Sequence, residues 1–253
     1  MWYAPSVSTW VTERAHAPWA FARQPMLELG RAHRARYLAA TPWPHVVIDD
    51  VLGEDRSLAI ARAFPAPNDA SWKRREYAEQ AGRLAHRNAL EDAEPALRTL
   101  LVELTQQPFL ELLNALVGRR DLIADPSYTG AGPLVTVRGG HLAVHVDFNR
   151  DSARKLDRVV TALYYAPLDW NDAWGGELEL WDRARTQCEV RIAPRRDRLV
   201  LIGYGEDHWH GHPSPLACPE GSSRAVVMAH YYAAREQAGD ADQAHGAIWA
   251  SQP

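Results

Sequence analysis

The sequence predicts an α+β protein, with a helical first half followed by a β-rich second half. Apolar residues recur at helical spacing between 94 and 116, which is typical of amphipathic helices. After Asp125-Pro126, hydrophobic residues alternate with a period of two, and Gly, Pro and Asp separate the alternating segments. Several short strands with turns between them are typical of a sandwich or barrel.

The N-terminal region is expected to support the β-rich half. Residues 1–23 have no clear period, so we expect an irregular arm there. Residues 24–40 suit a helix, which should end before Pro42 because proline disfavours helix at the residue before it. Residues 45–49, HVVID, are expected to form a short strand.

The next segments are expected to be mainly helical. Asp55 is a candidate cap for a helix over 57–64. The polar residues 66–91 are expected to form a loop and a ragged helix. Two helices, separated near Pro108, should cover 94–116, and we assign their leucine stripe to core packing.

The second half supplies the predicted strands, all identified by period-two alternation. They are 134–138, 141–147, 158–166, 176–181, 188–193, 198–203 and 224–233. We therefore expect one integrated domain made of a helical support region (24–120), a β core (121–236) and a C-terminal tail (237–253).

Composition narrows the function classes. The net charge is -4, with 28 Lys and Arg against 32 Asp and Glu, which disfavours a nucleic-acid-binding protein. The two Cys have no CxxC spacing, as expected in a reducing cytoplasm. The N-terminus does not resemble a signal peptide, and no run of 18 apolar residues occurs. We expect a cytoplasmic protein without a membrane span.

The segment 134–149, LVTVRGGHLAVHVDFN, contains the first candidate site residues. Residues two apart in a strand point to the same face, so His145 and Asp147 direct an imidazole and a carboxylate into one space. These are two of the three ligands of a facial iron(II) site. About one His-x-Asp pair is expected by chance in a chain with 11 His, so the prediction needs support from other residues.

Three further histidines, His208, His210 and His212, lie at alternate positions after the hydrophobic strand 198–203. They form either a polar loop or the missing part of a site. A structural zinc cluster is the weaker reading, because zinc sites of that type usually include Cys and neither Cys is adjacent. Arg224 opens a strand of Val and Met, where a buried charge must be paired. It either clamps a carboxylate of a ligand or forms a local salt bridge.

From Thr41 to Tyr232 the chain resembles the iron(II)- and 2-oxoglutarate-dependent oxygenases, in particular the prolyl-4-hydroxylase-like branch. The matching stretches occur in the family's order. They are PWPHVVIDDVL, DLIADPSYTGAGP, RGGHLAVHVDFN, RVVTALYYAPLDW, WGGELELWD, HWHGHPSPLACPEG and SRAVVMAHYY. The fold that this resemblance implies is a double-stranded β-helix, or jelly roll, with the N-terminal helices packed on one sheet.

The resemblance also implies roles for single residues. His145 and Asp147 match the proximal metal ligands and His210 the distal one, with His212 as its rival. Arg224 matches the residue that holds the far carboxylate of 2-oxoglutarate. Two positions depart from relatives: Thr136 stands where prolyl 4-hydroxylases have a Tyr that touches the co-substrate, and Val226 where Ser is frequent. Thr136 can still donate a hydrogen bond.

The implied activity is that of a dioxygenase that uses Fe(II), 2-oxoglutarate and O2, with ascorbate as an expected stimulant. It would hydroxylate an unactivated C–H bond of an amino-acid, peptidyl or small natural-product substrate and release succinate and CO2. The presence of Asp147 favours hydroxylation, because related halogenases lack this carboxylate. The alternative is a non-catalytic metal-binding jelly roll, such as a cupin-type sensor.

Candidate substrate-pocket residues lie near these motifs. They are Arg138, Asn149 and Trp181. The segments 149–158 and 66–91 are long enough to cover a site. The basic residues of 149–158 form either a solvated surface or an attraction for an acidic substrate.

Overall fold

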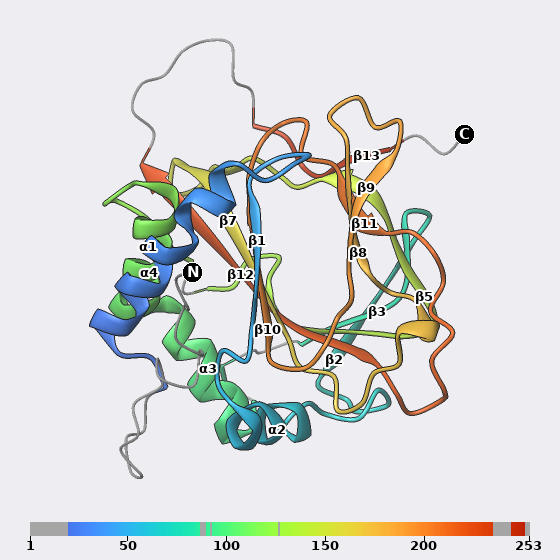
Figure 1. The fold of residues 1–253 in the computed structure, drawn as a ribbon. Coiled ribbons are helices and arrows are strands. Elements are labelled where there is room, and N and C mark those ends of the chain that lie inside the picture. The colour runs from blue at the N-terminus through green and yellow to red at the C-terminus, as the bar shows by residue number, and fades with distance from the viewer. Residues whose placement is uncertain (1–19, 87–89, 92, 126, 235–243, 251–253) are drawn as a thin grey trace, which may run out of the picture.

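One antiparallel sheet curls around the centre of the molecule, and helices cover one of its outer faces (Figure 1). The structure is a computed structural model that describes residues 20–86, 90–91, 93–125, 127–234 and 244–250. The expected arm therefore lies almost wholly outside the described residues, as does most of the expected tail.

The helices lie mainly in the first half of the chain, as expected. They are α1 (Arg23–Leu38), α2 (Glu54–Arg62), α3 (Pro95–Thr105) and α4 (Gln107–Val117), with a short 3-10 helix over Asp172–Trp174. Of the described helices, none is long and apolar enough to cross a membrane.

The strands follow the predicted segments closely in the second half. They are β1 (His45–Asp49), β2 (Trp72–Tyr77), β3 (Gln80–His86), β4 (Ile123–Ala124), β5 (Gly132–Val146), β6 (Arg150–Asp151), β7 (Leu156–Tyr165), β8 (Leu178–Trp181), β9 (Cys188–Ile192), β10 (Arg198–Gly203), β11 (His210–His212), β12 (Arg224–Ala234) and β13 (Ile248–Trp249). The main path through the sheet is β1-β10-β7-β12-β5-β11-β8-β9. The α+β double-stranded β-helix expected from the sequence is confirmed.

Alternation along β7, β10 and β12 separates two cores. One set of side chains packs outward against the helices, as Val160, Leu201 and Val227 do. The alternate set points into the curl, where Leu163 and Val226 meet Leu178 and Leu180 of β8. Since successive strand residues face opposite sides, the inward set on β12 begins with Arg224. The fold thus delivers this arginine to the interior.

The two helices expected over 94–116 are present as α3 and α4. Pro108 lies in the first turn of α4, where its missing N–H costs no intrahelical hydrogen bond. Both helices turn their leucines toward the sheet, and Leu97, Leu101, Leu112, Leu113 and Leu116 are fully buried. These helices support the wall made by β7, β10 and β12.

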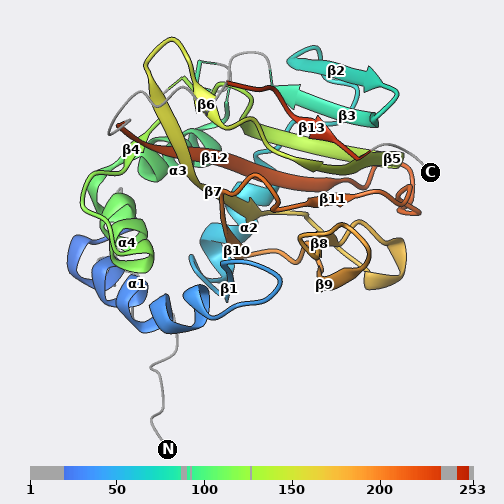
Figure 2. The same ribbon diagram turned by 90° about the horizontal axis from the view of Figure 1, so that it is seen from above.

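The largest correction concerns residues 66–91, which we expected to form a loop and a ragged helix. They contain the antiparallel hairpin of β2 and β3, and β3 pairs with β5. Figure 2 shows this hairpin beside β5, on the side away from α1 and α4. Only Trp72 of β2 is buried, and its neighbours are polar and largely exposed. Strand β2 therefore has no alternating hydrophobic signal, and its backbone pairing with β3, which itself pairs with β5, sets its conformation.

Smaller corrections concern helix and strand ends. Helix α2 begins at Glu54 with Gly53 as N-cap, so Asp55 lies in its first turn and does not cap it. The carboxylate of Asp197 instead accepts hydrogen bonds from the backbone N–H groups of Leu52 and Gly53 at 2.9 and 2.7 Å. The two strands expected over 134–138 and 141–147 are one strand, β5, which passes through Gly139 at a φ of 75°.

Candidate metal centre

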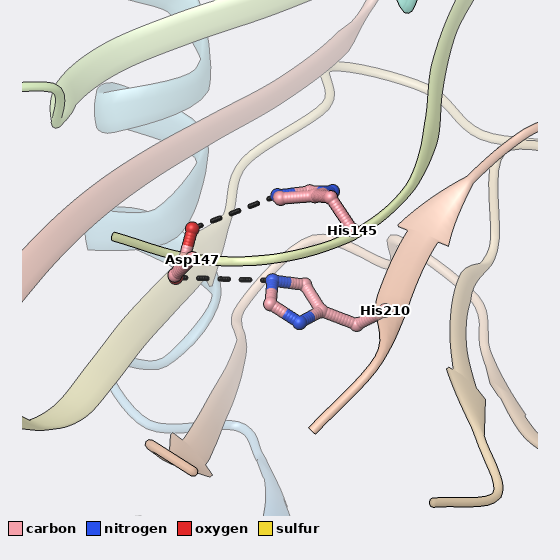
Figure 3. Close-up of side chains that lie close together, drawn as sticks. All are labelled: His145, Asp147 and His210. Carbon is pink, nitrogen blue, oxygen red and sulfur yellow. Dashed lines mark ion pairs between the residues drawn. The ribbon is translucent and has the colours of Figure 1, made fainter. Parts of the chain in front are cut away.

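Three side chains meet where β5 ends beside β11. Ligand atoms of His145, Asp147 and His210 all lie within 4.8 Å of one another. The Nε2 atom of His145 is 3.6 Å from one carboxylate oxygen of Asp147, and Nε2 of His210 is 3.8 Å from the other. Figure 3 shows both rings directed at the carboxylate. Two imidazoles and one carboxylate around one point form the donor set of a facial iron(II) site.

Strand register brings these residues together. His210 on β11 stands opposite His145 on β5 in an antiparallel pair. A side-chain carbon at Gly211 would lie 2.8 Å from the carbonyl oxygen of Ala143, so only glycine lets β11 approach β5 this closely. Asp147 follows the end of β5, two residues after His145, and its carboxylate therefore reaches the same space.

Backbone carbonyls orient both imidazoles for metal binding. The Nδ1 atom of His145 is 2.9 Å from the carbonyl oxygen of Ala143, and Nδ1 of His210 is 2.9 Å from that of His208. A carbonyl only accepts hydrogen bonds, so each Nδ1 must donate. In a neutral imidazole with this orientation, Nε2 carries the lone pair that a metal needs.

Burial keeps His210 neutral. Its pKa is lowered to about 4, mainly by burial and next by the neighbouring His145. The edge of its ring also meets the ring of Trp43, with ring centroids 6.2 Å apart. The Trp43 indole donates to the carbonyl oxygen of Trp181 at 3.1 Å and stacks on His208. His210 is thus held in one orientation and in the ligand form at neutral pH.

Asp147 is kept ionised by its surroundings. Burial alone would raise its pKa, but Arg158 and the neighbouring side chains of His145 and His210 together hold the pKa well below its usual value. A guanidinium nitrogen of Arg158 lies 2.6 Å from the carboxylate, and this side chain is fully buried. The contact is an ion pair rather than an aligned hydrogen bond, because no guanidinium nitrogen of Arg158 has a hydrogen-bond partner among the described residues.

A cavity of about 180 Å³ opens from the three side chains toward Arg224. Arg224 donates from Nε to the carbonyl oxygen of Gly176 at 2.7 Å and from Nη2 to the hydroxyl of Tyr165 at 2.8 Å. Gly175 and Gly176 have positive φ angles of 76° and 75°. The turn that they form brings the Gly176 carbonyl close to Arg224. No described residue accepts a hydrogen bond from Nη1, so this nitrogen is available to a ligand.

The structure separates the three close histidines. His210 joins His145 and Asp147, whereas His208 stacks on Trp43 and donates from Nδ1 to the carbonyl oxygen of Gly203 at 2.7 Å. His212 lines the same cavity but does not belong to the group of ligand atoms. A register shift between His210 and His212 explains why they do not point to the same spot.

The other residues proposed from the sequence lie beside the cavity rather than on its wall. Thr136 is buried, and its Cα pairs with that of Arg224 across β5 and β12. Arg138 donates to the carbonyl oxygen of Cys218, and Trp181 donates to Glu179. Asn149 accepts a hydrogen bond from the backbone of His245. None of the four is among the described residues that line the cavity.

Sequence reasoning missed several residues that contribute to the site. Arg158 and Tyr165 contact Asp147 and Arg224 respectively. Arg158 opens an apolar strand as Arg224 does, and the same argument about buried charge would have identified it. Trp249 also lines the cavity, and its ring lies 5.0 Å from that of His145. Its short strand β13 falls in the segment expected to be a tail, and two residues give no periodic signal.

Comparisons with known proteins agree with this geometry. The family model of the 2OG-Fe(II) oxygenase superfamily matches residues 133–232, the segment that contains His145, Asp147, His210 and Arg224. No curated protein matches the sequence.

Solved structures show the same fold at low sequence identity. A prolyl hydroxylase from Trichoplax adhaerens, in complex with a hypoxia inducible factor oxygen degradation domain peptide fragment, is 20% identical over 83% of this chain and 91% of that chain, with a TM-score of 0.58. A prolyl-4-hydroxylase from Pseudomonas putida is 20% identical over 81% of this chain and 98% of that chain, with a TM-score of 0.55. A prolyl 4-hydroxylase structure from Phytophthora capsici is 19% identical over 90% of this chain and 72% of that chain, with a TM-score of 0.55.

At these identities the structures establish the fold alone, while the family match covers the segment with the candidate ligands. Both agree with the resemblance found in the sequence. The β core of the chain is similar to the 2OG-Fe(II) oxygenase superfamily over residues 133–232, and the fold is similar to that of prolyl hydroxylases.

Proposed function

We propose that this protein is an iron(II)- and 2-oxoglutarate-dependent hydroxylase. The observation that carries the proposal is the pairing of two sites in one cavity. At one end, His145, Asp147 and His210 offer three ligand atoms on one side of a metal position. At the other end, Arg224 offers an unoccupied guanidinium nitrogen. A co-substrate with a metal-chelating end and a distant carboxylate fits this arrangement.

The bound metal and co-substrate would supply the oxidising chemistry, and the protein would hold them and the substrate in position. When bound, Fe(II) and 2-oxoglutarate activate O2, which inserts one oxygen atom into a C–H bond and yields succinate and CO2. His145, Asp147 and His210 would hold the metal and leave its remaining positions open toward the cavity. Arg224, oriented by Gly176 and Tyr165, would hold the far carboxylate of the co-substrate. Leu163, Val226 and other apolar residues of the wall exclude bulk water.

The proposed substrates are an amino acid, a peptidyl residue or a small natural product. The cavity of about 180 Å³ is smaller than the roughly 300–1,000 Å³ of most ligand pockets, which favours a small substrate group beside the co-substrate. The peptide complex of the Trichoplax adhaerens relative supports keeping a peptidyl residue in the proposal.

Succinate formation tests the proposal. Purified protein with Fe(II), ascorbate and 2-oxoglutarate should release succinate, alone or with candidate substrates, and His145→Ala or His210→Ala should abolish it. This loss of activity should exceed the loss of about 10–100-fold that is typical when a residue hydrogen-bonded to a metal ligand is removed. His33→Ala, a half-buried histidine on α1 outside the cavity, is the matched control and should keep wild-type activity.

The non-catalytic alternative makes a different prediction. A metal-binding jelly roll would retain metal through His145 and His210 but would release no succinate. It would also bind 2-oxoglutarate weakly and equally in wild type and Arg224→Gln. A strong loss of 2-oxoglutarate affinity in Arg224→Gln, with metal content unchanged, supports the enzyme.

A further inference from the structure

We propose that Arg75, Arg83 and His212 form a second anion-binding subsite, which recognises a carboxylate or phosphate group of the substrate. This inference rests on the proposed function, because it assigns the substrate class of the same cavity. It predicts that the enzyme oxidises a small acidic molecule rather than a neutral one.

The β2–β3 hairpin brings the two arginines to the cavity. Arg83 on β3 pairs with Thr136 on β5, and Thr136 pairs on its other side with Arg224 on β12. The two arginines therefore stand in one row across three neighbouring strands. Arg75 stands opposite Arg83 within the hairpin. Arg75, Arg83 and Arg224 all line the cavity.

These cations have no acidic partner within the described ranges of the chain. Among the described residues, no ion pair includes Arg75, Arg83 or Arg224. Arg83 donates to the neutral side chain of Gln80 at 2.8 Å, and the buried Nε of Arg75 has no hydrogen-bond partner. Burial, followed by repulsion from Arg224 and Arg75, lowers the pKa of Arg83 to about 10. Buried charges are normally paired because isolation is costly, so an anionic ligand is the missing partner.

His212 provides an independent sign of a missing ligand. Its side chain lies on β11 and is only 3% exposed, yet neither ring nitrogen has a hydrogen-bond partner among the described residues. It lines the cavity together with Arg83 and Arg224. A buried polar group without a partner is rare in native proteins, and an imidazole N–H can donate a hydrogen bond to an anion.

Charge balance assigns this subsite to the substrate. Asp147 is the one carboxylate among the described residues that line the cavity, and Arg158 already pairs with it. One carboxylate of 2-oxoglutarate would bind at the metal and the other at Arg224. No described carboxylate is then left to compensate Arg75 and Arg83, which favours a substrate that brings negative charge.

The basic residues of the segment 149–158 do not belong to this subsite. Arg150 and Arg154 of the segment 149–158 pair with Asp157 and Asp151, at 2.8 and 2.6 Å. Arg158 pairs with Asp147. These three arginines are therefore paired within the protein, whereas Arg75 and Arg83 of the hairpin have no ion-pair partner in the described part of the chain.

Calorimetric titration of the full-length protein loaded with Zn2+ and 2-oxoglutarate tests the subsite. The probes are three acidic molecules, L-aspartate, L-glutamate and O-phospho-L-serine, each with the counterpart that lacks the side-chain charge, L-asparagine, L-glutamine and L-serine. We expect at least one acidic probe to bind about tenfold more tightly than its counterpart, which corresponds to about 1.4 kcal/mol. The comparison of carboxylate and phosphate probes identifies the preferred anion.

Variants on the hairpin localise the effect. Arg83→Gln should remove the preference for the acidic probe, and Arg83→Lys should retain part of it. Arg74→Gln is the matched control, because Arg74 lies on β2 of the same hairpin but is exposed and pairs with Glu76. It should bind the acidic probe like the wild type, and circular dichroism and thermal unfolding confirm that each variant is folded.

The binding of 2-oxoglutarate alone separates this inference from the proposed function. If Arg83→Gln weakens 2-oxoglutarate as much as Arg224→Gln does, the hairpin serves the co-substrate and the inference is overturned. It is also overturned if no acidic probe binds more tightly than its neutral counterpart while 2-oxoglutarate binds normally. If the wild type does not bind 2-oxoglutarate at all, the proposed function fails, and the inference fails with it.

Discussion

Asp147 is shared between a protein cation and the expected metal. Its carboxylate lies 2.6 Å from Arg158 and also accepts a hydrogen bond from the Thr161 hydroxyl at 3.4 Å. Without metal, Arg158 is the nearest compensation for this buried charge. A bound metal ion would supply a second positive charge beside this carboxylate. The residue therefore links metal binding to the stability of the fold.

Replacing Arg158 by Met tests this link. Breaking a buried ion pair by removing one partner costs about 3–5 kcal/mol, so Arg158→Met should lose about that much unfolding free energy in EDTA. With saturating Zn2+, the loss should be clearly smaller, because the metal compensates Asp147. Urea unfolding under both conditions measures the difference.

Arg183→Met is the control for that experiment. Arg183 pairs with Asp207 at 2.5 Å on the surface, and exposed pairs contribute about 0–1 kcal/mol. Its loss should be small with or without Zn2+. An equal loss for Arg158→Met in EDTA and in Zn2+ would show that Arg158 acts through packing alone.

Buried histidines make the metal-free protein sensitive to acid. Burial, followed by the charge of Arg158, lowers the pKa of His230 to about 3. The unfolded chain binds a proton at this residue below about pH 6.5, whereas the folded chain does not. Stability from this group is therefore complete above about pH 6.5 and is lost as the pH falls toward the folded pKa.

His230→Gln should weaken this pH dependence. Between pH 6 and pH 4, the unfolding free energy of the variant should fall less steeply than that of the wild type, by up to about 1.4 kcal/mol per pH unit. Urea unfolding in EDTA at several pH values measures the slope, which does not depend on any constant loss caused by the substitution itself. Parallel slopes would mean that His230 is protonated in the folded protein.

At the residue scale, the sequence was informative wherever a side chain followed a regular period. His145 and Asp147 are two apart in a strand, and Arg224 opens one, so their placement could be predicted. The preference for His210 over His212 came from the family resemblance and not from a period, because a register shift in β11 separates the two side chains. Arg83 lies 141 positions before Arg224 in the sequence, and only the pairing of β3 with β5 brings the two to one cavity.

At the element scale, tyrosines join the sheet to the helices. Tyr231 of β12 is fully buried, and its hydroxyl donates to the carbonyl oxygen of Leu104, near the end of α3, at 2.8 Å. The last carbonyls of a helix have no intrahelical partner. This bond therefore satisfies a buried acceptor and fixes α3 on the outer wall.

Tyr231→Phe removes that bond and leaves the acceptor buried. We expect a loss of about 1–3 kcal/mol in unfolding free energy, measured by urea unfolding. Tyr77→Phe is the control, because Tyr77 is 64% exposed on the hairpin, and it should change stability by less than about 0.5 kcal/mol. Equal effects of the two substitutions would contradict a role of Tyr231 in holding α3.

Helices and strands were predicted correctly where one face of the element is buried in a core. They were missed where only backbone pairing with a neighbouring strand determines the conformation. Helices α3 and α4 and strands β7, β10 and β12 have one face on a core, so their apolar residues follow the expected periods. The hairpin of β2 and β3 is mostly polar, and β11 and β13 are only three and two residues long. The β2–β3 hairpin, β11 and β13, which were not predicted, each contribute residues that line the cavity.

At the scale of the whole molecule, the curled sheet brings residues from distant parts of the sequence into one site. Residues of β5, β11 and β12 are far apart in the chain but adjacent in the sheet. The helices stabilise the outer face, and the interior is left for side chains that bind. The jelly-roll class could be predicted from strand count and family resemblance, while the substrate depends on the cavity wall, which no local pattern describes.

The most direct test of the central claim is a crystal structure of the protein with Zn2+ and 2-oxoglutarate. We predict one ion bound by Nε2 of His145, Nε2 of His210 and a carboxylate oxygen of Asp147, at about 2.0–2.2 Å. The far carboxylate of 2-oxoglutarate should contact Nη1 of Arg224. An ion bound through His212 instead, or a co-substrate that does not reach Arg224, would contradict the account.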